Sequence, residues 1–263
     1  MKTDLERALS DFRKGFTNVP IWIALGWNDV QGRYNRSQLG IFWASISVLI
    51  FVTALGSIYS SLFEIETRAY MLHFILGVVV WNYISGIVLE SGREFVNAAD
   101  YLISFQVGYF TLLLRVVWRN FVVFLYQMLV FVLLAVYFGQ APKLVWVIVP
   151  LALIVITLNA LWMGMLMSIF ATRFRDLSEL MNNVFRLLFF VTPIMWMPHM
   201  KADLKPIVES NPFYHLIQLF REPLYSGSLT IHSWVVAIVL SVLGWVVAFS
   251  LFVRYRSRLA FWL

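Results

Sequence analysis

The chain has 263 residues, of which 61% are hydrophobic and only 13% charged, with a formal net charge of +6 and no cysteine. Soluble domains are about 45–50% apolar and about 25% charged, so this composition excludes a water-soluble fold and makes lipid the expected solvent. The absence of cysteine excludes disulfides and thiol chemistry, and nothing in the charge indicates a nucleic-acid partner.

The apolar runs of the sequence are continuous and uncharged over long stretches. In lipid, only helices and closed barrels satisfy their own backbone groups. A barrel would show short segments of alternating polarity instead. The sequence therefore predicts an all-α integral membrane protein.

Residues 1–37 are predicted to form a cytoplasmic amphipathic segment at the membrane interface. Leu5, Leu9, Phe12 and Phe16 recur at steps of four, three and four, which places them on one face of a helix whose other face is charged. Such a helix lies along the membrane surface. A plain flank of the first membrane anchor is the alternative interpretation.

Residues 38–263 are predicted to form one transmembrane domain of six helices. Crossing a hydrocarbon core of about 30 Å takes about 20 apolar residues. Segment 206–231 is half apolar but broken by three prolines and a glycine. We expect it to form an extracytoplasmic hairpin, re-entrant or surface-lying, before the last helix. The runs assigned to the six helices are residues 39–63, 69–89, 120–142, 144–172, about 177–197 and 233–253.

Lysine and arginine in the connections predict the orientation of these helices. With six helices, thirteen of these residues lie on the side of the two termini and five on the other side, setting aside Arg115 and Arg119 near the start of the third helix. Both termini are therefore expected in the cytoplasm. Arg33 and Arg36, in the stretch GRYNRSQLGIFW, then mark the cytoplasmic end of the first helix.

No motif for catalysis, nucleotide binding or metal binding is found. The sequence has no Gly-Lys dipeptide, so it has no P-loop, and it has no His-Glu-x-x-His pattern. Its four histidines are scattered without acidic neighbours, and we interpret them as structural or interfacial. We therefore expect no catalytic residue, no metal site and no cofactor in this chain. The four histidines are His73, His199, His215 and His232.

One polar cluster occurs in the fifth predicted helix. Glu179, Asn182, Asn183 and Arg186 are spaced i, i+3, i+4 and i+7 and share one face. Polar groups of spanning helices usually face a bundle interior or a water-filled cavity, which predicts a pathway or a subunit partner on this face. Alternatively, the first turns of the helix lie at the wet interface, and the sequence does not decide between the two.

Aromatic side chains make up 17% of the sequence, and part of them lie within the predicted helices. Aromatic faces suit the apolar C–H faces of sugar rings and need no charged group to bind them. Phe42, Phe185 and Phe189 are examples. Packing against lipid or a neighbouring helix is the other interpretation of these side chains.

Five stretches of the chain occur in the same order in one family. On these stretches the chain resembles the permeases of type-2 ABC exporters that move polysaccharides and polyol phosphates, among them O-antigen, capsule and teichoic-acid exporters. The resemblance covers essentially the whole chain. The stretches are RYNRSQLGIFW at 33–43, FRDL at 174–177, TPIMW at 192–196, NPFYHLIQLFREPLYSG at 211–227 and YRSRL at 255–259.

The resemblance implies a homodimer of six-helix permease subunits in the inner membrane of a bacterium. Two copies of a separate ATPase would bind ATP and magnesium, and this chain would be no enzyme. The substrate would be a lipid-linked, O-antigen-like glycan moving out of the cytoplasm. The alternatives are a permease for capsule, teichoic acid or another lipid or drug, and less closely a membrane-bound transferase or a passive channel.

The resemblance also implies a coupling helix in the loop between the second and third predicted helices, which would dock on the ATPase. That helix would be GREFVNAADYLISF at 92–105, opened by Gly92. An ordinary cytoplasmic loop is the alternative. The residues expected at the ATPase contact are Arg93, Glu94, Phe95, Asp100 and Tyr101.

The pathway is expected along the seam of the dimer, because a polymer longer than the membrane is thick needs a continuous channel. Arg33 or Arg36 is expected to contact the diphosphate of the lipid carrier, since arginine binds phosphate oxygens in bidentate geometry. A role in anchoring the first helix alone is the alternative. The residues expected to line the pathway are Phe42, Trp43, Asn182, Phe185 and Phe189.

Overall fold

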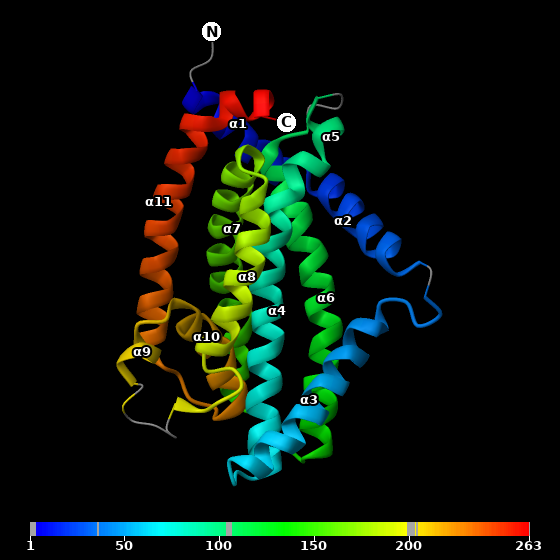
Figure 1. The fold of residues 1–263 in the computed structure, drawn as a ribbon, viewed down its shortest axis with the longest axis vertical. Helices are drawn as coiled ribbons and strands as arrows, with labels where there is room; N and C mark the ends of the chain where they lie inside the picture. Colours follow the sequence, from blue (N-terminus) through cyan, green and yellow to red (C-terminus); the bar gives the residue numbers. More distant parts are fainter. Residues whose placement is uncertain (1–3, 36, 104–106, 199–202, 204, 263) are drawn as a thin grey trace.

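A computed structural model describes residues 4–35, 37–103, 107–198, 203 and 205–262, and all regular secondary structure in these ranges is helical. Most of the helices run alongside one another, and α1 and the end of α11 lie at the same end of the bundle (Figure 1). In chain order the elements are α1 (Asp4–Thr17), α2 (Val19–Tyr34), α3 (Phe42–Leu62), α4 (Thr67–Asn97), α5 (Ala99–Ile103), α6 (Tyr109–Tyr137), the 3-10 helix η1 (Leu144–Ile148), α7 (Val149–Arg173), α8 (Asp176–Val191), α9 (Lys205–Glu209), α10 (Pro212–Tyr225) and α11 (Ile231–Trp262).

Five helical stretches in the described part of the chain are long and apolar enough to cross a membrane: α3, α4, α6, η1 with α7, and α11. They contain 21 to 32 residues. At about 1.5 Å per residue, each reaches across a hydrocarbon core of about 30 Å. The prediction of an all-α, multi-pass membrane protein is confirmed.

The fifth predicted span, at about 177–197, is shorter in the structure. α8 has 16 residues and ends at Val191, whereas a full crossing needs about 20. Pro193 follows and pushes the residue before it out of the helical region, and Thr192 is indeed extended with ψ of 134°. The count of six spanning helices therefore stays a prediction.

Three helices extend beyond the uncharged runs from which they were predicted: α4, α6 and α11, the last of which continues to residue 262 rather than 253. α4 continues to residue 97 rather than 89, and α6 begins at residue 109 rather than 120. The added turns carry Glu90 and Glu94 on α4 and Arg115 and Arg119 on α6, which pair with each other across the two helices. Charge compensation between neighbouring helices is why charged sequence remains helical here.

α4 is the central helix of the molecule, as Figure 1 shows. The most apolar stretch of α4 is 78% buried, whereas those of the other four spans are 22–44% buried. α4 packs against α3, α6, α7, α8 and α10. Side chains such as Phe74, Ile84 and Ile87 are almost completely buried, so α4 positions the helices around it.

A short helical hairpin, α9 with α10, lies at the end of the molecule opposite α1 (Figure 1). The side chain of Asn211 caps α10 by accepting the N–H groups of Phe213 and Tyr214. Gly227 follows α10 with a φ of +76°, a conformation that favours glycine. With 14 residues, α10 is too short to cross a membrane.

α10 is packed into the bundle, in contact with α4, α7 and α11. Arg221 is 1% exposed, and its Nη1 donates to the carbonyl of Pro193 and to Nε2 of His73, both at 2.9 Å. The Tyr70 hydroxyl donates to the carbonyl of Met195 at 2.5 Å. The irregular backbone that follows α8 is therefore held in place by side chains of α4 and α10.

α1 and α2 pack against the bundle at its other end, α1 on α6 and α11 and α2 on α6. The ring of Phe12 stacks on Phe110 with centroids 4.1 Å apart. Leu5, Leu9 and Phe16 are instead 50–66% exposed. An exposed apolar stripe beside a charged face is typical of a helix in the lipid headgroup region.

We predict that both ends of the hairpin lie on the outer side of the membrane. The native chain has no cysteine, so single cysteines at the exposed positions Ser210 and Ser228 should both react with an impermeant maleimide added to spheroplasts. A cysteine at exposed Ala260, near the end of α11 that lies beside α1, is the control and should react only after permeabilisation. Reaction of just one hairpin position from outside would mean that this segment crosses the membrane.

Candidate functional site

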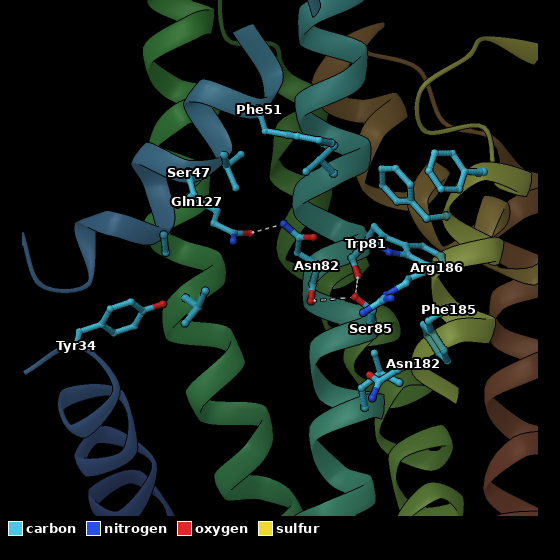
Figure 2. A pocket seen from close by; sticks show the side chains of 17 residues that line it. Tyr34, Ser47, Phe51, Trp81, Asn82, Ser85, Gln127, Asn182, Phe185 and Arg186 are labelled. Atoms are coloured by element: carbon cyan, nitrogen blue, oxygen red, sulfur yellow. Dashed lines mark hydrogen bonds between the residues drawn. The ribbon is translucent and has the colours of Figure 1, made fainter. Parts of the chain in front are cut away.

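A cavity of about 850 Å³ lies between α3, α4, α6 and α8, with the last turn of α2 at its edge. Figure 2 shows Tyr34, Ser47 and Gln127 on one side of the cavity and Asn182, Phe185 and Arg186 on the other. Its walls combine aromatic rings, neutral polar groups and a single charged side chain. The lining residues that carry the argument below are Phe51, Trp81, Asn82, Ser85, Gln127, Asn182, Phe185, Arg186 and Phe189.

Neutral polar side chains of α4 and α6 face each other in the cavity. The amide of Asn82 donates to the side-chain oxygen of Gln127 at 3.3 Å, as the dashed line in Figure 2 marks. The Ser85 hydroxyl donates to the carbonyl of Trp81 at 2.7 Å. Such groups can exchange these bonds for bonds to a ligand at small cost, because no buried charge is uncovered.

The aromatic wall of the cavity is formed by Trp81 of α4 together with two rings of α8. Phe185 and Phe189 lie 5.8 and 5.9 Å from the Trp81 ring, centroid to centroid. Phe213 of α10 supports this wall from behind, 5.4 Å from Trp81 and 5.6 Å from Phe185. The wall is rigid on its α10 side, since Phe185 is only 4% exposed.

The structure brings together three of the five residues expected to line a pathway. Asn182, Phe185 and Phe189 line the cavity. Phe42 and Trp43 do not line it, because they begin α3 and are 54% and 46% exposed. The Phe42 ring packs edge-on against Tyr126 at 5.2 Å, on the outside of the bundle.

Sequence reasoning missed the polar groups that α4 and α6 contribute. Asn82 and Ser85 interrupt an otherwise apolar run at a spacing of three, and Gln127 interrupts another. Polar residues within spanning helices are a recognised sign of a cavity or pathway. That signal was present in the sequence.

A second feature lies in the first three turns of α6, where side chains of α2 and α4 meet it. We call it the charge cluster, and its members are Asp29, Arg33, Glu90, Glu94, Arg115 and Arg119. Arg115 donates from Nε and Nη2 to the two carboxylate oxygens of Asp29, at 2.7 and 2.6 Å. Arg119 donates from Nη1 to Asp29 at 2.6 Å and from Nε to Glu90 at 2.8 Å. The charge cluster thereby ties α2 to α4 and α6.

The remaining side chains around the charge cluster add further contacts to its arginines and carboxylates. Glu94 lies 3.4 Å from Arg115 and 3.5 Å from Arg119. The amide of Asn120 donates to Glu90 at 2.8 Å. Asn120 reaches α4 because Gly86 has no side chain: a Cβ there would lie 2.2 Å from the Asn120 oxygen.

Electrostatics keep Asp29 ionised in this setting. Burial acts to raise the pKa of the Asp29 carboxyl, but the hydrogen bonds and charges of Arg115 and Arg119 outweigh it and hold the pKa below its usual value. The side chains of Asp29, Arg115 and Arg119 are 20%, 13% and 10% exposed. Charges this poorly hydrated depend on their partners far more than surface ion pairs do.

Of the two arginines expected to contact a substrate headgroup, one lies within the described residues. Arg33 donates to Glu90 at 2.8 Å and remains 45% exposed, so it belongs to the charge cluster and is also open to water. Arg36 lies outside the residues that the structure describes.

The segment expected to couple to an ATPase is divided between two helices. Gly92 does not open a new helix, because it lies inside α4, where a Cβ would come within 2.9 Å of Met167. α4 ends at Asn97 and the short α5 follows. The last two positions of the predicted helix, 104 and 105, lie outside the described residues.

The five residues expected at this contact differ in exposure. Glu94 and Phe95 are 4% and 0% exposed, so in this arrangement their side chains support the bundle rather than face another protein. Arg93 and Asp100 are exposed, and Arg93 pairs with Glu179 at the start of α8. Tyr101 is half-buried beneath the guanidinium of Arg115.

We predict that the charge cluster is needed for stability. Arg119→Met should lower the free energy of unfolding by about 3–5 kcal/mol, because three carboxylates lose a partner in poorly hydrated surroundings. Arg254→Met, at an exposed position of α11, is the matched control and should cost less than about 1 kcal/mol. Thermal unfolding of the purified variants in detergent measures both. Equal melting temperatures would contradict the prediction.

Comparison with known proteins places the chain in a family. Among curated proteins it is similar to the O-antigen export system permease protein RfbA of Klebsiella pneumoniae, with 24% identity over 88% of this chain and 90% of the relative. It is also similar to the permease of the same name in Myxococcus xanthus, with 23% identity over 66% of this chain and 67% of the relative. Residues 21–225 match the ABC-2 type transporter family. The chain therefore belongs to the ABC-2 type transporter family, as a transport permease and not an enzyme.

Proposed function

We propose that this chain is the transmembrane subunit of an ATP-driven exporter that moves a lipid-linked polysaccharide of the O-antigen type from the cytoplasm across the bacterial inner membrane. Membership of the ABC-2 type family supports the transport role. The names of the relatives support the class of substrate. A separate ATPase subunit supplies the energy and holds the ATP and magnesium.

The observation that carries the substrate class is the composition of the cavity. The lining combines aromatic rings, of which those of Phe51 and Phe189 are more exposed than that of Trp81, with neutral amides and hydroxyls. Aromatic faces cover the apolar faces of sugar rings, and amides bond to sugar hydroxyls. A pathway for many successive sugars has to bind each one weakly enough to release it, and a wall with one charged residue meets that need.

A second copy of the chain is proposed to complete the pathway. α3 is only 22% buried over its most apolar stretch, and Leu187 and Phe190 of α8 are 68% and 63% exposed. Asn183 and Arg186 are also exposed on α8, and such groups are costly to leave in lipid. A homodimer that joins α3 and α8 of each subunit would cover both the apolar and the polar part of this surface.

Two copies of the ATPase are proposed to dock on the corner formed by the end of α4 and by α5. Arg93, Asn97 and Asp100 are exposed there. Arg93 pairs with Glu179, at the start of the helix that carries Asn182 and Phe185. A push on this corner would therefore reach the wall of the cavity through a single ion pair.

Deletion of the chain tests the proposed function. A deletion strain should lose its long-chain surface polysaccharide and accumulate lipid-linked polymer inside, and the wild-type gene should restore export. Gel analysis of the surface polysaccharide and extraction of the lipid-linked polymer measure the two effects. An unchanged surface polysaccharide with no internal polymer would overturn the assignment.

Blocking the cavity should stop export without harming assembly. Ser85→Trp would fill the space between α4 and α6 and should lower the export rate at least tenfold. Ser250→Trp, at an exposed position of α11, is the matched control and should leave export unchanged. Phe189→Ala removes one aromatic face, worth about 0.5–1.5 kcal/mol, and should slow export several-fold.

Phe185 is unsuitable for this test because it is almost completely buried. Truncating a buried phenylalanine costs about 3–5 kcal/mol of stability, and a loss of export would then report on folding. If Ser85→Trp exports at the rate of Ser250→Trp, the polymer does not pass through this cavity.

A further inference from the structure

Asp29 lies among arginine N–H groups that are arranged like an oxyanion site. Arg115 bonds its two carboxylate oxygens through Nε and Nη2 at 2.7 and 2.6 Å, and Arg119 adds Nη1 at 2.6 Å. The paired donors of a guanidinium match carboxylate and phosphate equally well. A phosphate group therefore fits the donors that Asp29 now occupies.

Asp29 has a second possible partner on its own helix. Arg33 follows Asp29 by four residues, and an acid placed four residues before a base is the favourable order on a helix. In the structure Arg33 bonds Glu90 instead, at 2.8 Å. Should Asp29 turn to Arg33, Glu90 keeps its bonds to Arg119 and Asn120. The exchange leaves no carboxylate without a partner.

The donors vacated by that exchange would be the fork of Arg115 and one N–H of Arg119. They need an acceptor, since unpaired guanidinium donors in poorly hydrated surroundings are costly. The lipid-side phosphate of an isoprenyl diphosphate, which is bonded through two of its oxygens, carries a single negative charge, as a carboxylate does. One phosphate therefore replaces Asp29 without changing the charge balance at the two arginines.

The site is reachable from the cavity. Tyr34 of α2 lines the cavity together with Leu89 of α4 and Val123 of α6. Leu89 adjoins Glu90 in the sequence, and Val123 lies about one turn from Arg119. A lipid headgroup in the cavity is therefore close to the charge cluster.

We propose that Asp29 fills a phosphate site formed by Arg115 and Arg119, and that a phosphate of the lipid-linked substrate displaces it. Asp29 then pairs with Arg33, and α2 is released from α4 and α6. This rests on the proposed function in taking the substrate to be a lipid with a phosphate-bearing headgroup. A bound headgroup thus frees α2 by competing with Asp29 for the same arginine donors.

The permease with its ATPase, reconstituted in lipid nanodiscs, tests the inference. Val30 adjoins Asp29 and is 3% exposed, so the rate at which a cysteine in Val30→Cys reacts with maleimide reports the release of α2. A C15 isoprenyl diphosphate, the lipid probe, should raise this rate on the order of tenfold. Inorganic pyrophosphate at the same concentration should not, and an equal effect from it would overturn the assignment to a lipid headgroup.

Three variants distinguish an effect on the phosphate site from a general effect on folding. Asp29→Asn should react quickly without any probe and bind the isoprenyl diphosphate on the order of tenfold more tightly, because the internal competitor is weakened. Arg115→Lys keeps the charge but loses the fork, and should weaken binding by a similar factor. Asp11→Asn breaks another poorly hydrated Asp–Arg pair, between α1 and Arg256 of α11, and should change neither reading.

The outcomes distinguish this inference from the proposed function. Labelling and affinity that stay at wild-type values in Asp29→Asn would overturn the inference, and so would an effect of the same size in Asp11→Asn. Neither the labelling rate nor the affinity for the isoprenyl diphosphate depends on the glycan. Failure of these tests with normal export in cells overturns the phosphate site alone. An unaltered surface polysaccharide in the deletion strain overturns the proposed function, whatever the labelling shows.

Discussion

The ion pairs between α4 and α6 are the interaction on which the rest of this structure depends. A charged side chain in a spanning helix is tolerated when it faces the bundle interior and finds a partner there. Glu90 and Glu94 of α4 and Arg115 and Arg119 of α6 meet this condition together. Without that pairing, neither helix would continue through its charged turns, and α2 would lose the arginines that hold Asp29.

The same requirement explains the opposite end of the molecule. Where α8 stops, the backbone around Pro193 and Met195 has no helical partners, and irregular backbone survives at membrane depth only when protein satisfies it. Arg221 and Tyr70 donate to those two carbonyls. The buried Arg221 thus satisfies a backbone carbonyl that has no helical partner. α8 can therefore end early, and the chain can turn into the hairpin.

The sequence was informative about the fold wherever composition alone decides the outcome. Continuous apolar runs predicted α3 and α7 closely and α11 except for its charged last turns, and the prolines and glycine of 206–231 predicted a broken segment. It failed at the ends of α4 and α6, because a charged turn looks like a loop until its partner is known. Such partners are 20 to 30 residues apart in sequence, as Glu90 and Arg119 are, or further, as Asp29 and Arg115 are.

The candidate site was predictable to a similar degree. Spacing on one helix placed Asn182, Phe185 and Phe189 together, and they line one cavity. Spacing does not tell which face of α3 turns inward. Phe51 is the α3 aromatic that lines the cavity, and Phe42 and Trp43 lie outside it. Nor could spacing show that Glu94 and Phe95 are buried, since burial depends on how α4 packs against α6 and α7.

Contacts from both ends of the molecule converge on α8, which carries part of the aromatic wall of the cavity. Phe213 of α10 supports Trp81 and Phe185, and α10 in turn holds the end of α8 through Arg221. At the other end, Arg93 holds the start of α8 to α4. α8 is therefore attached near both ends, to α10 and α4 at one end and to α4 at the other, and it packs on α4 and α7 in between. A helix held in this way moves together with α4, so a push on the end of α4 would change the width of the cavity by moving α4 and α8 against α3.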